Sequence, residues 1–68
     1  MAAPTVTRPL TPREDEVFSL LMEGFTDGEI ADRLGCSAYT VRAHIRTVRG
    51  KLGATSRVQA VAVYLRAK

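Results

Sequence analysis

The chain has 68 residues, 46% of them hydrophobic and 25% charged, and it holds one cysteine. This length allows one small domain, the longest apolar run is too short to span a bilayer, and a single cysteine excludes an internal disulfide. The net charge of +3 is unevenly spread, because residues 1–32 hold all seven acids and two arginines, while residues 33–68 hold eight Arg or Lys and no acid; this polarity indicates a polyanionic partner, nucleic acid ahead of a membrane surface.

Residues 1–9 contain two prolines and show no hydrophobic periodicity. They are predicted to be a flexible leader or the remnant of a linker, and residues 10–68 to be the domain. The leader has neither a sizeable apolar stretch nor a basic flank before one, so it does not have the pattern of a secretory signal. We therefore expect a cytoplasmic protein.

Two copies of one helix-start pattern follow. Thr11 precedes Pro12, and Glu14 stands three residues after Thr11, which is the spacing of a capping box and predicts a helix over 12–23. Thr26 and Glu29 repeat this spacing and predict a helix over 27–34. Gly24 and Gly35 mark the expected ends of these two helices.

A third helix is predicted over 38–52, with Ser37 as its cap and Gly53 after its end. Its apolar residues recur at spacings of four, three and four, which defines one buried face: Val41, Ile45, Val48 and Leu52. Only residues 35–37 separate it from the preceding helix, as in the tight turn of a helix-turn-helix.

Ser56 and Gln59 resemble a third capping box, and the helix predicted over 56–67 is apolar almost all round. One side holds Ala60, Val61 and Tyr64 and is sufficient for the core. The neighbouring side holds Val58, Ala62 and Leu65, and two readings of it stay open: it pairs with a second copy of the chain, or it lies under the first helix. The expected fold class is all-α, a four-helix helix-turn-helix domain.

The third helix carries the expected function. Arg42 and Arg46 are four residues apart and share a face, and an Arg in the major groove can bond two acceptors of guanine at once. Tyr39 and Ala43 lie on or beside that face and join them as expected base-reading residues. Expected phosphate contacts are Thr26, Thr40, Arg49, Lys51 and Arg57.

Cys36 and His44 do not form a convincing catalytic pair, because they are eight residues apart and no orienting Asp or Asn is near them in sequence. Cys36 is expected to fill space at the turn, and His44 to be a half-buried side chain bonded to backbone or phosphate. One Cys and one His cannot assemble an ordinary zinc site. We expect no enzymatic activity, no metal and no cofactor.

Residues 10–62, "LTPREDEVFSLLMEGFTDGEIADRLGCSAYTVRAHIRTVRGKLGATSRVQAVA", resemble the C-terminal DNA-binding domain of the LuxR/FixJ/NarL family of bacterial transcription regulators. The most specific blocks are Leu10 to Glu14 with Glu16-Val17, then Glu29-Ile30-Ala31, then Thr40-Val41 with His44, then Lys51-Leu52-Gly53 with Ser56-Arg57. The resemblance implies that the third helix enters the major groove and that the fourth pairs two copies over a two-fold site.

The same resemblance carries expectations beyond this chain. Members usually have a receiver or ligand-sensing domain before this one, so the sequence is either an excised domain or a short stand-alone regulator. RNA polymerase is a further candidate partner. Ala38 and Tyr39 stand where charged residues are common, and Gly50 stands where a bulkier or basic residue is common, so the base preference depends on this chain's own side chains.

Two other functions fit parts of the pattern. A sigma-factor promoter-reading domain shares the acidic first helix and basic third helix, but a capped apolar helix after the third disfavours it. A protein-binding adaptor could use the same frame and its apolar fourth helix to hold a partner. Binding to duplex DNA that falls steeply with salt would separate the DNA reader from the adaptor.

Overall fold

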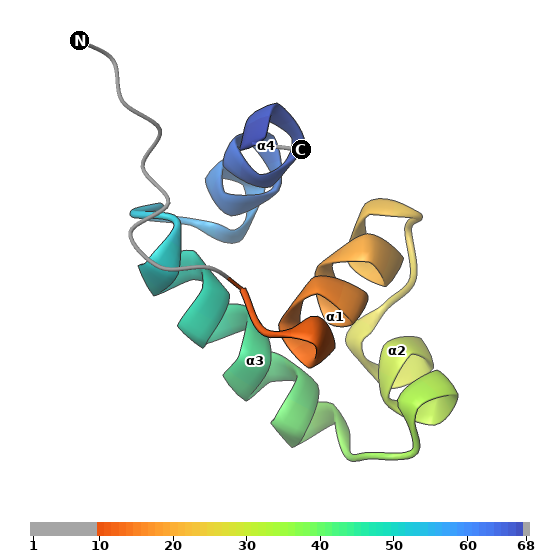
Figure 1. The fold of residues 1–68 in the computed structure, drawn as a ribbon. Coiled ribbons are helices and arrows are strands. Elements are labelled where there is room, and N and C mark those ends of the chain that lie inside the picture. The colour runs from red at the N-terminus through yellow and green to blue at the C-terminus, as the bar shows by residue number, and fades with distance from the viewer. Residues whose placement is uncertain (1–9, 68) are drawn as a thin grey trace, which may run out of the picture.

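The computed structural model describes residues 10–67, and within this range the chain forms four helices: α1 Pro12–Met22, α2 Asp27–Leu34, α3 Ala38–Lys51 and α4 Arg57–Ala67. The all-α prediction is confirmed, and no predicted boundary differs from the observed one by more than one residue. Figure 1 shows α1 near the middle of the molecule, with α2 and α3 beside it and α4 at the end away from α2. The predicted leader, 1–9, lies outside the described residues.

The starts of α1 and α2 are the two predicted capping boxes. The Thr11 hydroxyl accepts from the Glu14 backbone N–H at 3.2 Å, and the Glu14 carboxylate accepts from the Thr11 N–H at 3.0 Å. The same two bonds at Thr26 and Glu29 measure 3.2 and 2.8 Å. Each box satisfies backbone donors that the first helical turn leaves free.

The start of α4 differs from the predicted capping box in one bond. Ser56 Oγ accepts from the Gln59 N–H at 3.1 Å, as a capping box requires. The Gln59 side chain, however, returns to Thr55, where its Oε1 accepts from the backbone N–H at 2.6 Å and from the hydroxyl at 2.8 Å. Thr55 offers two donors to one acceptor, so it replaces Ser56 in the return contact.

The end of α3 is closed by Gly53. Its φ of 68° lies in the left-handed region, which costs glycine nothing and strains other residues. The Gly53 N–H reaches the Gly50 carbonyl at 3.1 Å, and the Ala54 N–H reaches the Arg49 carbonyl at 3.0 Å. These two bonds form a Schellman motif, which satisfies carbonyls at the helix end and turns the chain toward α4.

All four helices contribute to a single core. The α3 face predicted from spacing is fully buried and packs against side chains from the other three helices. The core consists of Val17, Phe18, Ile30, Ala31, Val41, Ile45, Val48, Leu52, Ala60 and Tyr64. Because α3 contributes Val41, Ile45 and Val48, and Leu52 follows directly at its end, the core fixes the orientation of α3 and leaves its opposite face to solvent.

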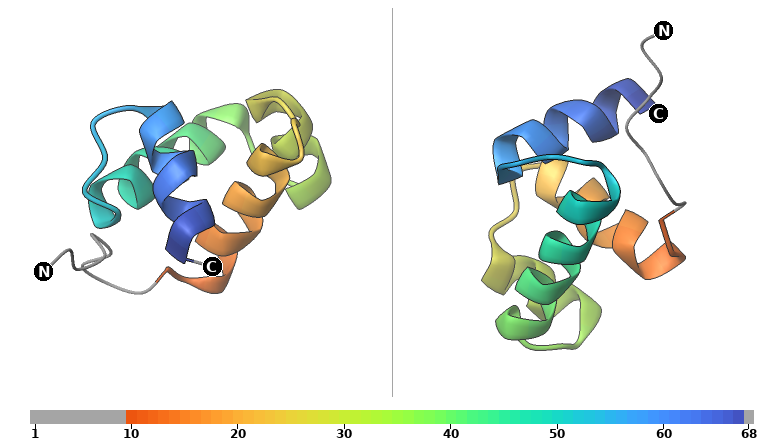
Figure 2. Two further views of the ribbon diagram at one scale, coloured as in Figure 1. Left: turned by 90° about the horizontal axis from the view of Figure 1, so that it is seen from above. Right: turned by 90° about the vertical axis from the view of Figure 1, so that its left-hand side faces the viewer.

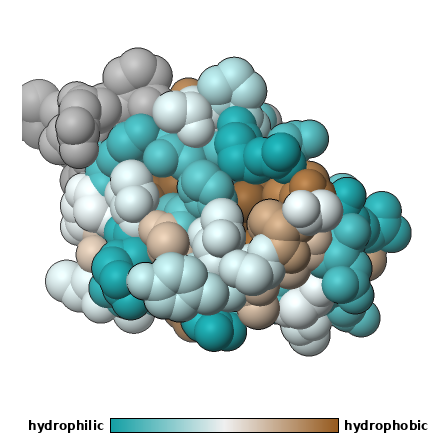
Figure 3. All heavy atoms as spheres, turned by 90° about the horizontal axis from the view of Figure 1, so that it is seen from below, coloured by the Kyte–Doolittle hydropathy of each residue, from teal (hydrophilic) through white to brown (hydrophobic). Residues whose placement is uncertain are grey.

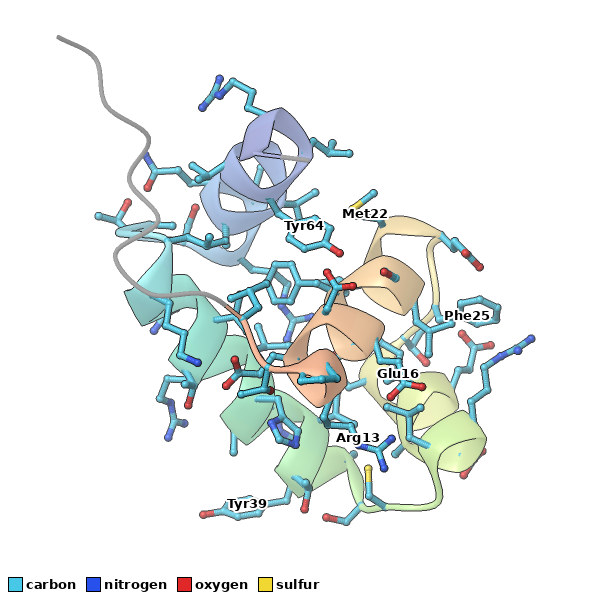
Figure 4. The ribbon with its side chains drawn as sticks, viewed as in Figure 1. Arg13, Glu16, Met22, Phe25, Tyr39 and Tyr64 are labelled. Atoms are coloured by element: carbon cyan, nitrogen blue, oxygen red, sulfur yellow. The ribbon has the colours of Figure 1, made fainter. Side chains whose placement is uncertain are left out.

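Tyr64 attaches α4 to α1. Its ring packs on Phe18, with 5.4 Å between ring centroids and 53° between ring planes. Its hydroxyl donates to Asp15 Oδ1 at 2.5 Å and lies 3.2 Å from Ser19 Oγ. Figure 4 shows this side chain pointing from α4 into the space above α1. Within residues 10–67, no helix is long and apolar enough to cross a bilayer.

Candidate nucleic-acid interface

The turn between α2 and α3 is that of a helix-turn-helix. Gly35 ends α2 with φ 71°, and the Cys36 N–H donates to the Ala31 carbonyl at 3.0 Å. Ser37 then caps α3, its Oγ accepting from the Thr40 N–H at 3.1 Å. A side chain at Gly35 would meet no atom within 4 Å, so its backbone conformation, not space, requires glycine there.

The α3 helix has one apolar and one cationic face. Val41, Ile45 and Val48 are buried, while Arg42 and Arg46 are exposed. The helix contains four Arg or Lys residues and no acid. Solvated helix faces usually mix both signs of charge, so a single-sign face is suited to a polyanion.

The other two expected base-reading residues lie near the start of α3. Tyr39 is 73% exposed, and Figure 4 shows its ring directed away from the domain at the N-terminal end of the helix. Ala43 is half-buried beside Arg42. All four expected base-reading side chains thus belong to α3, and three of them, Tyr39, Arg42 and Arg46, are exposed.

The end of the molecule that holds the α2–α3 turn is shown in Figure 3. Hydrophilic and intermediate residues cover most of this surface, and apolar spheres occupy a small area near its middle. A surface of this kind suits a wet, polar interface better than a dry protein–protein interface.

Two of the expected phosphate contacts are threonines at helix starts. Thr26 is exposed; its N–H donates to Glu29 Oε1 and its hydroxyl oxygen accepts from the Glu29 N–H, so the donors left at the start of α2 are the Thr26 O–H and the N–H groups of the residues just after it. Thr40 is half-buried, and its Oγ1 lies 3.1 Å from Ser37 Oγ. Its hydroxyl is already part of the cap of α3.

Lys51 lies in a different environment from the exposed one expected of a phosphate contact. Its Nζ donates to Glu14 Oε1 at 2.6 Å, and the two side chains are 10% and 8% exposed. Burial alone would raise the pKa of Glu14, but bonds from Lys51 and the Thr11 backbone, with the Lys51 charge, outweigh it and lower the pKa. Lys51 therefore joins α3 to α1.

Arg57 also has a partner that the sequence did not indicate. Its Nη2 donates to Asp27 Oδ2 at 3.1 Å, with the side chains 45% and 17% exposed. The other oxygen of Asp27 is buried and, among residues 10–67, has no hydrogen-bond partner. Arg49, the remaining expected phosphate contact, is half-buried near the end of α3.

Cys36 fills space at the turn, as expected, whereas the expectation for His44 is met only in its burial. Cys36 is half-buried against the core at the turn. His44 is half-buried, but within the described range its imidazole makes no hydrogen bond to the backbone, contrary to one of its two expected roles. In that same range no three His, Cys, Asp or Glu residues gather as metal ligands would.

The second apolar side of α4 is open at two of its three positions. Val58 is 80% exposed and Leu65 is 53% exposed, while Ala62 is half-buried. The alternative that this side lies under the first helix is therefore wrong for Val58 and Leu65. Ala60 and Tyr64, from the side of the helix that was expected to face the core, are buried in it.

Comparison with known proteins gives one consistent result. A family model described as bacterial regulatory proteins of the luxR family matches residues 8–64. The transcriptional regulator MalT of Yersinia pestis (strain Pestoides F) is 42% identical over 55 residues, as is MalT of Serratia proteamaculans (strain 568). The matched segment is 81% of this chain and 6% of either MalT protein.

Solved structures agree. The transcription factor GerE superposes with a TM-score of 0.82 at 41% identity, over 88% of this chain and 91% of that one. VqmA, in the Vibrio cholera VqmA–ligand–DNA complex, gives 0.84 at 38% identity, over 90% of this chain and 27% of that one. The response regulator ChrA gives 0.81 at 28% identity, over 88% and 30%. With its four helices, its turn and these matches, the chain belongs to the luxR family of bacterial regulatory proteins.

Proposed function

We propose that this domain binds double-stranded DNA in a sequence-specific manner on behalf of a bacterial transcription regulator, with α3 in the major groove. One observation carries the proposal: the core holds α3 by Val41, Ile45 and Val48, and so presents Arg42 and Arg46 together on its outer face. The names of MalT and GerE, and the VqmA–DNA complex, support it by homology. Such a regulator acts in the cytoplasm and needs no catalytic site.

The side chains divide into two roles. Arg42 and Arg46 read guanine through two parallel hydrogen bonds, Ala43 contacts a thymine methyl group, and Tyr39 reaches a base or a phosphate at the groove edge. Thr26, Thr40, Arg49 and Arg57 bind phosphate and set the register of the domain on the duplex. Lys51 is not included, since its ammonium group is buried against Glu14.

The proposed active unit is a homodimer on DNA. The side of α4 formed by Val58, Ala62 and Leu65, of which Val58 and Leu65 are exposed and Ala62 is half-buried, buries apolar surface when two copies pair. A pair of domains then reads two half-sites related by two-fold symmetry. RNA polymerase is a further proposed partner, for a regulator that activates transcription.

Selection of bound sequences from a pool of random duplexes tests this function. We expect recovery of a preferred site with two symmetric halves, and an affinity that falls steeply between about 50 and 200 mM salt. An affinity for duplex DNA that is absent, or that does not change with salt, would contradict the proposal and favour the protein-binding adaptor.

Arg46→Ala separates base reading from charge. It should cost roughly 1–3 kcal/mol on the selected site and relax the preference at one base pair. Arg66→Ala is the matched control, because Arg66 is an exposed arginine at the far end of α4. Equal losses for the two variants on random DNA and on the selected site would remove the base-reading role of Arg46.

A further inference from the structure

The ion pair between Asp27 and Arg57 joins two segments that are thirty residues apart. Asp27 is the first residue of α2, and Arg57 is the first residue of α4. The right-hand view in Figure 2 draws the start of α4 near the segment that leads into α2, the left-hand view separates the two backbones, and the long Arg57 side chain makes the contact. The pair thus lies between two helix starts, next to Thr26, one of the proposed phosphate contacts.

The two partners are unequally exposed. The Asp27 side chain is 17% exposed and one of its oxygens is buried without a partner in residues 10–67, so its charge is compensated mainly by Arg57. The Arg57 side chain is 45% exposed and uses one nitrogen in the contact. A guanidinium group has five N–H donors, so Arg57 retains donors that face solvent.

The carboxylate and a DNA phosphate are the same kind of partner for Arg57. Both are anions with paired acceptor oxygens that fit the guanidinium fork. If a phosphate took Arg57 entirely, Asp27 would remain buried, charged and unpaired beside a polyanion, which is unfavourable. Arg57 is therefore only partly available to DNA.

On this basis, and resting on the proposed function, we infer that Asp27 competes with DNA phosphate for Arg57 and thereby lowers the sequence-independent affinity of the domain. Asp27 touches no base and no phosphate in this arrangement. It acts through Arg57 as a positioning residue. The stronger the Asp27–Arg57 ion pair is, the less often Arg57 is available to bind a DNA phosphate.

Asp27→Asn tests the inference, because asparagine keeps the shape of the side chain and removes its charge. We expect affinity for random duplex DNA at low salt to rise about threefold or more. The plot of log affinity against log salt should become steeper by about 0.9, the slope contributed by one more neutralised phosphate. The gain should be the same on the selected site, since phosphate contacts carry no sequence information.

Two controls identify the mechanism. Asp32→Asn removes one negative charge from an exposed position on the same helix and should have a smaller effect. In a chain that already carries Arg57→Gln, Asp27→Asn should raise the affinity for random duplex DNA much less than it does in the wild-type chain. An equal gain from Asp32→Asn, or a full gain without Arg57, would mean that the carboxylate acts by general repulsion and would overturn the competition.

The design separates this inference from the proposed function. Wild-type affinity for random duplex is measured first, with thermal unfolding by circular dichroism to confirm that each variant is folded. Failure of the wild-type chain to bind contradicts the proposed function itself. A wild-type chain that binds, with an Asp27→Asn variant that is folded and binds no more tightly, contradicts the competition alone.

Discussion

Glu14 is the one charged side chain that is fully buried in residues 10–67, at 6% exposure, and it serves two elements. The same oxygen accepts from the Thr11 N–H, which closes the start of α1, and from Lys51, which ends α3. A buried carboxylate is tolerated only when such bonds replace its lost hydration. The charge of Glu14 is therefore coupled to the stability of the fold.

This coupling predicts a pH dependence. The pKa of Glu14 is lower in the folded chain than in the unfolded one, so its contribution to stability is complete above the unfolded pKa of about 4.3 and is lost as the pH falls through the folded pKa. Glu14→Gln should lower the free energy of unfolding by about 1–3 kcal/mol at pH 7. The gap between wild type and variant should narrow below about pH 4 in urea titrations.

Glu16→Gln provides the comparison. Glu16 pairs with Arg13 at 3.4 Å, but these side chains are 59% and 49% exposed, so the pair should contribute under about 1 kcal/mol. A stability gap for Glu14→Gln that is no larger than that for Glu16→Gln, or that does not change with pH, would show that the buried pair is unimportant.

Gly50 offers a stabilising substitution. It lies within α3, is exposed, and a methyl group placed there would meet no atom within 4 Å. Gly50→Ala should raise the free energy of unfolding by about 0.5–1 kcal/mol, because glycine loses more backbone freedom than alanine when a helix forms.

Gly53→Ala should lower the free energy of unfolding by about 1–2 kcal/mol, since a φ of 68° is strained for alanine. Thermal unfolding of both variants measures the contrast.

At the scale of elements, α4 contributes two residues to the core, as many as α1 or α2 does, and it is held in place largely by Tyr64. Ala60 and Tyr64 are its buried side chains, and the Tyr64 hydroxyl adds the contact with Asp15. Tyr64→Phe should cost about 1–2 kcal/mol and increase amide exchange in α4 more than in α3. Leu65→Ala, at an exposed position on the same helix, should change stability by less than about 0.5 kcal/mol. Equal exchange in α3 and α4 would argue against separate attachment of α4.

The helices could be predicted from sequence because their boundaries are encoded locally. A cap such as Thr11, a glycine such as Gly35 and the spacing of Val41 and Ile45 all act within one or two turns. The outward positions of Arg42 and Arg46 follow from the same periodicity. These signals need no knowledge of the tertiary fold.

The long-range ion pairs could not be predicted in this way. Lys51 and Glu14 are 37 residues apart, and Asp27 and Arg57 are 30 apart, so no local periodicity links them. On a sequence, Lys51 and Arg57 read as part of the cationic set, whereas in the structure each faces an acid from an earlier helix. The number of cations available to DNA is therefore smaller than the count in the sequence.

At the scale of the whole molecule, charge is divided between the two halves of the chain, with every acid before residue 33. The acidic helices α1 and α2 are packed against the basic helix α3, and two acids of the first half neutralise cations of the second. Of the arginines in residues 10–67 that make no ion pair, three lie on α3, whereas α2 and α4 carry one each: Arg42, Arg46 and Arg49, then Arg33 and Arg66. A charged molecule of this kind is oriented by the field of a duplex before it makes contact.

Pairing of two molecules gives a prediction at this scale. Val58→Glu should leave the stability of the monomer within about 0.5 kcal/mol, since the side chain is 80% exposed, and should reduce cooperative binding to a two-half site. Gln59→Glu places the same charge one residue away on another side of α4 and should retain cooperativity. Unfolding of the Val58 variant, or full cooperativity in it, would contradict the proposed dimer face.

The division of α3 into a packed face and an outward face has an evolutionary consequence. The residues that hold the helix in place are different from those that would choose the bases, so a duplicated gene could acquire a new operator by changing Tyr39, Arg42, Ala43 or Arg46 while the scaffold is inherited unaltered. In a library randomised at those four codons, most members should fold and should differ from one another in the DNA sequence that they prefer. Such a library should be a practical source of regulators that act on separate operators.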